Sequence, residues 1–185
     1  MLFSFLQLRN YIPDGVYQTA YDINYSELYK HKKRLIIMDI DNTLIPYDLF
    51  EPTDKIIALV EKIKTLGFII VFMSNNRKKR VFAFASKLDS PYIASAHKPF
   101  SRGYKKIKKM FPEITFKEMH VIGDQLMTDI LGAKRMGITC DLVKVIKRKS
   151  EKWYTKVNRL LERFVLIRIK KHFPQKYHEI ISLME

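Results

Sequence analysis

Four short stretches of the sequence carry the side chains that could perform chemistry. The first is RLIIMDIDNTLIP, residues 34–46, in which Asp39 and Asp41 flank Ile40 after an apolar run. The other three are Ser74-Asn75-Asn76, His97-Lys98-Pro99, and Gly123-Asp124 with Asp129 shortly after it. Together they supply carboxylates, a hydroxyl and an ammonium group, which suit a hard divalent cation and an anionic substrate.

Each stretch also has a plain structural interpretation. An isolated Asp-x-Asp at the end of a strand is more often a turn or a helix cap than a catalytic pair. Ser-Asn-Asn is common in turns and helix starts, a single lysine is usually a surface residue, and Gly-Asp is a frequent turn. A functional site is indicated because all four occur in one chain and each follows its own predicted strand.

Apolar runs of strand length alternate with longer segments of helical periodicity through the middle of the chain. The runs are continuous, which predicts strands buried on both faces in a parallel sheet. Strands are predicted at 34–40, 68–74, 92–95, 119–124 and 138–145, and helices at 53–67, 77–89, 101–113 and 125–137. The sequence therefore predicts an α/β fold, a three-layer doubly wound parallel sheet, with a ligand site beyond the carboxyl ends of the strands.

The motifs DIDNTL, SNN, KP and GDQLMTD resemble, in this order, the four signatures of the haloacid dehalogenase (HAD) superfamily. The resemblance covers residues 34 to about 145. It implies a Rossmann-like core in a superfamily of mostly magnesium-dependent phosphatases. We expect an N-terminal extension that packs on the core at 1–33, a HAD catalytic core at 34–149, and a basic amphipathic helical extension at 150–185.

The first motif has the central role in the chemistry that this resemblance implies. Asp39 would be the nucleophile that forms an aspartyl phosphate, and Asp41 the general acid and base. Asp39, the main chain of Asp41 and Asp124 would hold Mg²⁺, which prefers oxygen ligands. The sequence offers no paired Cys or His ligands, which argues against zinc.

The other motif residues have supporting roles. The resemblance implies that the Ser74 hydroxyl and the backbone N–H of Asn75 bind a phosphoryl oxygen, and that Lys98 neutralises charge in the transition state. Thr43 is expected to stabilise the turn after Asp41. For Asp129 the alternatives stay open: a partner of magnesium or of Lys98, or a side chain that faces the next helix.

Many members of this superfamily carry a cap domain over the site, inserted either just after the first motif or between the second and third motifs. The spacing of the motifs here leaves no room for such a domain. One loop, one helix and one strand fill the chain between Asp41 and Ser74, and the stretch from Ser74 to Lys98 is shorter. We therefore expect an open site. Such a site favours a phosphate presented by a large molecule or a membrane surface over a small metabolite that needs enclosure.

Positive charge is concentrated toward the C-terminus. The net charge is +15, and residues 144–171 contain eleven Lys and Arg against two acids. A field of this sign attracts nucleic acid, anionic membranes or phosphorylated small molecules. A helical stripe in this region either packs on the sheet or lies on anionic lipid, and it consists of Trp153, Val157, Leu160, Leu161, Phe164 and Ile167.

The composition also bears on the compartment. The single cysteine, Cys140, cannot form an intramolecular disulfide, which suits a reducing environment. No stretch approaches the roughly 20 apolar residues that span a bilayer. We expect a cytoplasmic protein, peripheral on the inner face of the membrane if the stripe binds lipid, and no partner protein can be inferred.

Three functions are compatible with these features. The DNTL, GDQLMTDIL and TKVNRLLER segments resemble a capless, subclass III branch that includes mitochondrial and plastid phosphatidylglycerophosphate phosphatases. This implies hydrolysis of phosphatidylglycerophosphate to phosphatidylglycerol; the alternative substrate is a soluble phosphorylated sugar, nucleotide or polynucleotide end. An RNA- or ribosome-associated module is the third reading, supported by basic clusters at 77–80 and 98–109. A sheet covered on both faces offers it no exposed aromatic platform for base stacking.

Overall fold

A six-stranded parallel sheet lies at the centre of the protein, whose computed structural model describes residues 7–147 and 153–183, with the backbone alone for 153–157. The strand order is β1-β6-β5-β2-β3-β4, and every neighbouring pair is parallel. The strands are β1 (Gly15–Tyr17), β2 (Leu35–Met38), β3 (Ile69–Met73), β4 (Tyr92–Ile93), β5 (Met119–Gly123) and β6 (Thr139–Val143). The predicted α/β architecture is confirmed.

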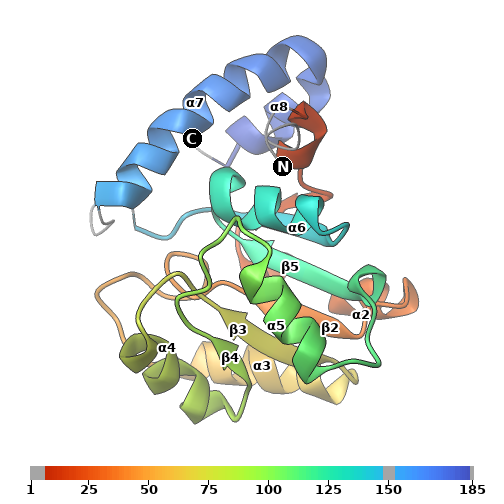
Figure 1. The fold of residues 1–185 in the computed structure, drawn as a ribbon, viewed down its shortest axis with the longest axis vertical. Coiled ribbons are helices and arrows are strands. Elements are labelled where there is room, and N and C mark those ends of the chain that lie inside the picture. Colours follow the sequence, from red (N-terminus) through yellow and green to blue (C-terminus); the bar gives the residue numbers. More distant parts are fainter. Residues whose placement is uncertain (1–6, 148–152, 184–185) are drawn as a thin grey trace.

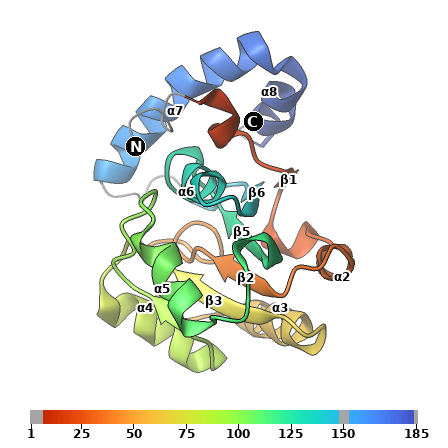
Figure 2. The same cartoon turned by 45° about the vertical axis from the view of Figure 1, so that its right-hand side comes forward.

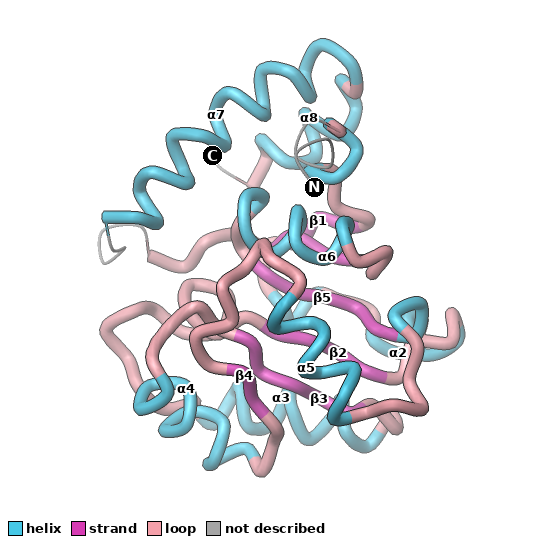
Figure 3. The backbone as a smooth tube through the Cα atoms, in the orientation of Figure 1, coloured by secondary structure: helices cyan, strands magenta, loops and turns pink. Residues whose placement is uncertain are grey.

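Helices cover both faces of the sheet (Figures 1 and 3). One face carries α2 (Tyr25–Lys30), α3 (Asp54–Thr65) and α4 (Lys78–Ala85). The other carries α5 (Arg102–Met110), α6 (Leu131–Arg135), α7 (Trp153–His172) and α8 (Pro174–Ile181). Along β2, Leu35 and Ile37 enter one apolar cluster and Ile36 and Met38 enter the other. A strand with both faces buried explains the continuous apolar run in the sequence.

Several short turns complete the chain. They are the 3₁₀ turns η1 (Leu8–Tyr11), η2 (Ala20–Asp22), η3 (Ser86–Leu88) and η4 (Phe116–Glu118), and the π-helical turn η5 (Leu126–Ile130). The predicted helix at 125–137 therefore begins as η5 and continues as α6. Gly67 and Gly137 have φ of +94° and +70°, values that glycine adopts readily where a helix ends.

The N-terminal region contributes an edge strand that the sequence analysis did not predict. β1 pairs with β6, and the Asp14 N–H donates to the carbonyl of Cys140 at 2.8 Å. β1 is too short to show an apolar run in the sequence, so its pairing is decided by the neighbouring strand.

The C-terminal helix α7 (Figure 2) packs on the core, and burial shows that it does so through a face other than the predicted stripe. Leu166 and Ile169 are buried, whereas Leu160, Leu161, Phe164 and Ile167 are exposed. The side chains of Trp153 and Val157 lie outside the described residues. None of the helices in the described part of the chain is long and apolar enough to cross a bilayer.

Candidate active site

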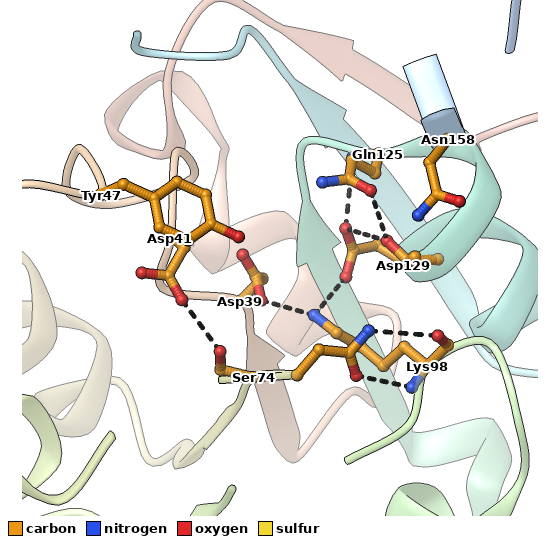
Figure 4. A pocket seen from close by; sticks show the side chains of 10 residues that line it. Asp39, Asp41, Tyr47, Ser74, Lys98, Gln125, Asp129 and Asn158 are labelled. Carbon is orange, nitrogen blue, oxygen red and sulfur yellow. Dashed lines mark hydrogen bonds and ion pairs between the residues drawn. The ribbon is translucent and has the colours of Figure 1, made fainter. Parts of the chain in front are cut away.

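The polar residues predicted from the sequence meet at the carboxyl edge of the sheet (Figure 4). There they line a small hollow that is partly open to solvent. Its walls are formed by Asp39, Asp41, Tyr47, Ser74, Asn75, Lys98, Gln125, Thr128, Asp129 and Asn158. Asp124 lies just behind this wall and is 4% exposed.

A tight turn after β2 places the two carboxylates of the first motif. Ile40 is buried in the apolar core between them. Asn42 has a φ of 66°, which asparagine tolerates, and its N–H donates to the carbonyl of Ile45 at 2.7 Å. The alternation of a strand therefore turns Asp39 and Asp41 past the sheet while the residue between them anchors the turn.

Lys98 joins Asp39 to Asp129. Its Nζ lies 2.5 Å from Asp39 Oδ1 and 2.6 Å from Asp129 Oδ1, and all three side chains are buried. Burial acts to lower the pKa of Lys98, but the carboxylates of Asp129 and Asp39 raise it above its ordinary value. Lys98 therefore stays charged at neutral pH, and among the alternatives left open for Asp129 the structure places it against Lys98.

Gly123 is required by the position of Asp129. A Cβ on Gly123 would lie 2.3 Å from Cγ and 2.7 Å from Oδ2 of Asp129, closer than any real contact. The Asp129 carboxylate is further fixed by the Gln125 N–H and the Thr128 hydroxyl, each donating at 3.2 Å. The glycine of the fourth motif thus lets Asp129 approach the strand closely enough to hold Lys98.

Asp41 has a different set of partners from Asp39. The Ser74 hydroxyl donates to Asp41 Oδ2 at 3.0 Å, and the Asn76 side-chain amide donates to the same oxygen at 3.3 Å. Arg80 Nε donates to Asp41 Oδ1 at 2.5 Å. Figure 4 shows Asp39 directed toward Lys98 and Asp41 directed toward Ser74. The two carboxylates are therefore equipped for different roles.

Arg80 was grouped with a basic surface cluster in the sequence, and that assignment is wrong for this residue. Its neighbours 77–79 are exposed, but Arg80 is 7% exposed and lies at the inner side of α4. Its guanidinium also donates to the carbonyl of Pro46 at 3.2 Å and lies over the ring of Phe50. One member of the 77–80 cluster, Arg80, therefore serves the site. Because Arg80 is not on the surface, the cluster gives weaker support to nucleic-acid binding.

We predict that Arg80→Met lowers kcat by about tenfold to a hundredfold with little change in KM, because Asp41 loses the group that orients it. If Asp41 protonates the leaving oxygen, the loss should be larger for an alkyl phosphate than for p-nitrophenyl phosphate, whose leaving group needs little protonation. Steady-state kinetics on both substrates measure this difference. Lys79→Met, an exposed change on the same helix, is the matched control. Equal losses on both substrates would contradict the role.

Asn75 holds the third motif in place through its side chain. Its Oδ1 accepts the Lys98 N–H at 2.7 Å, and its Nδ2 donates to the Lys98 carbonyl at 3.1 Å. The sequence analysis assigned Asn75 to phosphate binding through its backbone N–H, and that role stays a prediction. The structure adds a second task, which is to fix the backbone that carries the lysine.

Asp39 and Asp124 approach each other on either side of Thr43. The Thr43 Oγ1 lies 3.4 Å from Asp39 Oδ2 and 3.2 Å from Asp124 Oδ1. Burial raises the pKa of Asp39 well above its usual range against the opposing effect of Lys98. It also raises the pKa of Asp124 to about 7 against the opposing effect of Arg159. Ionisation of both carboxylates thus calls for additional positive charge at this point.

The donor set fits a hard divalent cation. No three His, Cys, Asp or Glu side chains of the described residues converge on one metal position. The ligand set implied by the resemblance needs only two carboxylates and a main-chain oxygen, because the Asp41 side chain is engaged by Ser74 and Arg80. The site and its rear wall contain five buried carboxylates and three cationic side chains, which leaves a formal excess of two negative charges. The carboxylates are those of Asp39, Asp41, Asp124, Asp129 and Glu162, and the cations are Arg80, Lys98 and Arg159. One Mg²⁺ would offset that excess.

Several site residues were not found from the sequence. Tyr47, Gln125, Thr128 and Asn158 line the hollow, while Arg159 and Glu162 contact its rear wall. Asn158, Arg159 and Glu162 belong to the TKVNRLLER segment. Glu162 is one of only two acids in the strongly basic region 144–171. An isolated acid in such a region was the available signal, but helical periodicity alone did not show that it turns inward.

The fold and the site define a hydrolase with a Rossmann-like α/β core, in which the buried carboxylates of the first motif follow the central strand β2. The chain belongs to the HAD-like hydrolases. It is 32% identical over 161 residues to "Probable phosphatase YqeG" of Bacillus subtilis, a match that covers 87% of this chain and 92% of that protein. The HAD-hydrolase-like family model matches residues 87–156. The predicted superfamily is thereby confirmed.

Solved structures support the fold. An uncharacterised protein from Listeria monocytogenes serotype 4b is 18% identical with a TM-score of 0.51, over 64% of this chain and 85% of that one. The hypothetical protein XCC2798 from Xanthomonas campestris is 10% identical with a TM-score of 0.50, over 74% of this chain and 76% of that one. At this level of identity the likeness concerns the architecture.

Proposed function

We propose that this protein is a magnesium-dependent phosphomonoesterase that acts through an aspartyl phosphate on Asp39, and that its substrate is the head-group phosphate of phosphatidylglycerophosphate. The observation that supports the proposed reaction is that the two carboxylates of the first motif have different partners. Asp39 is paired with the cation Lys98, whereas Asp41 is held by Ser74 and Arg80. Adjacent carboxylates in different environments suit a nucleophile and a proton carrier.

The chain's own residues account for both halves of the reaction. In the first half a bond forms between the Asp39 carboxylate and phosphorus, the bond to the leaving oxygen breaks, and Asp41 gives that oxygen its proton. In the second half water attacks phosphorus, Asp41 takes the proton from the water, and the bond to Asp39 breaks to release phosphate. In both halves the Ser74 hydroxyl binds a phosphoryl oxygen and Lys98 neutralises negative charge on the phosphoryl group.

Mg²⁺, when bound by Asp39, Asp124 and the main chain of Asp41, would reduce the repulsion between the nucleophilic carboxylate and the dianionic phosphate. Thr43 keeps the two side-chain ligands close together. Removal of the metal with EDTA should therefore abolish turnover.

The exposed face of α7 supports a lipid substrate. Four apolar side chains project from it, and Phe164 and Ile167 are 62% and 67% exposed. Four exposed basic residues flank them, namely Arg163, Arg168, Lys170 and Lys171, and the acid within this stretch, Glu162, is buried. An apolar row edged by cations fits an anionic bilayer surface.

The position of α7 relative to the site is also consistent with this substrate. Asn158, near the start of the helix, lines the hollow, and the exposed apolar row begins two residues later. A helix lying on lipid at this point would bring the hollow next to the head groups. The hollow would need to take only the phosphate and its glycerol, because the acyl chains would remain in the bilayer.

The test compares phosphate release from phosphatidylglycerophosphate in mixed micelles with release from soluble sugar phosphates and nucleotides, with Mg²⁺ and with EDTA. We expect the higher kcat/KM on the lipid. In Phe164→Ser/Ile167→Ser, each lost apolar side chain removes about 1.5 kcal/mol of burial. Affinity for vesicles that contain phosphatidylglycerol should then fall by roughly a hundredfold, while turnover of p-nitrophenyl phosphate is unchanged.

Met110→Ser is the matched control, because Met110 is 45% exposed at the end of α5 away from the site. Unchanged vesicle binding by the double variant would contradict the role of α7. Faster turnover of a soluble phosphate would favour the soluble substrate class, and salt-sensitive RNA binding without turnover would favour the nucleic-acid module.

A further inference from the structure

The buried face of α7 reaches the rear of the active site. Figures 1 and 2 show where this helix lies, and it contacts η5, the turn that leads into α6. The side of α7 that faces the segment after β5 carries Arg159 and Glu162. The side chain of Arg159 is 15% exposed and that of Glu162 is 2% exposed. Neither residue belongs to the four motifs, although both contact the segment that follows β5.

Arg159 grips Asp124 at two points. Its Nη2 pairs with the carboxylate oxygen Oδ2, and its Nη1 donates to the main-chain carbonyl of the same residue at 2.8 Å. The other carboxylate oxygen, Oδ1, is left on the side of Thr43 and Asp39. Because a guanidinium is planar and donates in fixed directions, it determines which oxygen of Asp124 faces the site.

Glu162 fixes both Arg159 and the turn beyond Asp124. Its Oε2 lies 3.2 Å from Arg159 Nη1. Its Oε1 accepts the N–H of Leu126 at 2.7 Å and that of Met127 at 3.4 Å, at the start of η5. The same turn carries Asp129, the partner of Lys98. The buried side chain of Glu162 thus connects the C-terminal helix both with Arg159, the partner of Asp124, and with the turn that carries Asp129.

We infer that Arg159, held by Glu162, is a positioning residue that orients the Asp124 carboxylate for Mg²⁺. This inference rests on the proposed function, because it takes Asp124 as a ligand of the metal. The C-terminal helix then belongs to the active site rather than merely to the surface, and it completes the metal site from outside the four motifs. Partners of metal ligands commonly change metal affinity about tenfold to a hundredfold when removed.

Metal titration of the full chain tests the inference. We expect the Kd for Mg²⁺, measured by isothermal titration calorimetry, to rise about tenfold to a hundredfold in Arg159→Gln. Glu162→Gln should have an effect in the same direction. The double variant should lose less Mg²⁺ affinity than the two single variants lose in sum, because Glu162 acts through Arg159. With p-nitrophenyl phosphate, turnover should return to within a few-fold of normal when Mg²⁺ is raised to saturation.

Two further variants make the test specific. Arg159→Lys keeps the positive charge but lacks the planar fork, so its Mg²⁺ affinity should remain close to that of Arg159→Gln. Arg9→Gln makes the same substitution at an exposed arginine of η1 and should bind Mg²⁺ normally. Leu166 and Ile169 still anchor α7, so circular dichroism and thermal unfolding should show a folded protein in each case.

The outcomes separate this inference from the proposed function. If the unaltered protein binds Mg²⁺ and Arg159→Gln binds it equally well or more tightly, the positioning role is overturned and the proposed function stands. Tighter binding would mean that the guanidinium competes with the metal for Asp124. If the unaltered protein binds no Mg²⁺ and hydrolyses no phosphomonoester, both are overturned.

Discussion

Asp39→Asn is expected to reduce turnover by a factor on the order of 10⁴ or more, because the amide cannot attack phosphorus to form the covalent intermediate. The change nearly preserves the shape of the side chain, so the fold should be retained. The loss should appear in kcat, with substrate binding affected less. Acid quenching during turnover of a radiolabelled phosphomonoester should trap phosphate on the unaltered protein and none on the variant.

The control for this change is Asp54→Asn, which makes the same substitution at an exposed position in the first turn of α3. Its turnover should be close to normal. Hydrolysis by Asp39→Asn at the normal rate would remove Asp39 from the mechanism and with it the proposed reaction.

Lys98→Met is expected to lower both activity and stability. The lysine is buried between two carboxylates, so its removal leaves Asp39 and Asp129 without their shared cation. The loss of one partner from a buried ion pair costs about 3–5 kcal/mol in the free energy of unfolding. The loss of fixed positive charge near the phosphoryl group should lower kcat by about 10²- to 10³-fold.

Urea unfolding in EDTA measures the stability effect without a contribution from bound metal, and kinetics in saturating Mg²⁺ measure the activity. Lys106→Met, at an exposed position on α5, is the matched control. A Lys98→Met protein as stable as the control would show that the buried carboxylates do not depend on this lysine.

The positions of the four motifs could be predicted from the sequence because each follows a predicted strand, and for three of them that strand is a continuous apolar run. Parallel strands bring their carboxyl ends to one edge, so Asp39, Asp41, Ser74 and Asp124 had to lie near one another. Family membership agrees with this resemblance. The edge strand β1 was missed because three residues do not show a pattern of their own.

The orientation of individual helix side chains was decided by packing. Arg80 and Arg159 lie in strongly basic segments, and the sequence gives no local sign that either one points inward. Each turns toward a buried carboxylate because α4 and α7 dock with that side against the sheet and its loops. The same docking leaves Phe164 and Ile167 in solvent, although their periodicity was equally compatible with burial.

The sequence by itself determined the fold class, the order of the reactive motifs and the residue types that they deliver, since these depend on hydrophobic runs and on the residues that end them. The tertiary structure alone decided which charges are paired. Asp129 became the partner of Lys98, Arg80 that of Asp41, and Arg159 that of Asp124. The physical reason is that a buried charge requires a partner in space, and residues far apart in the chain meet only when the layers pack together.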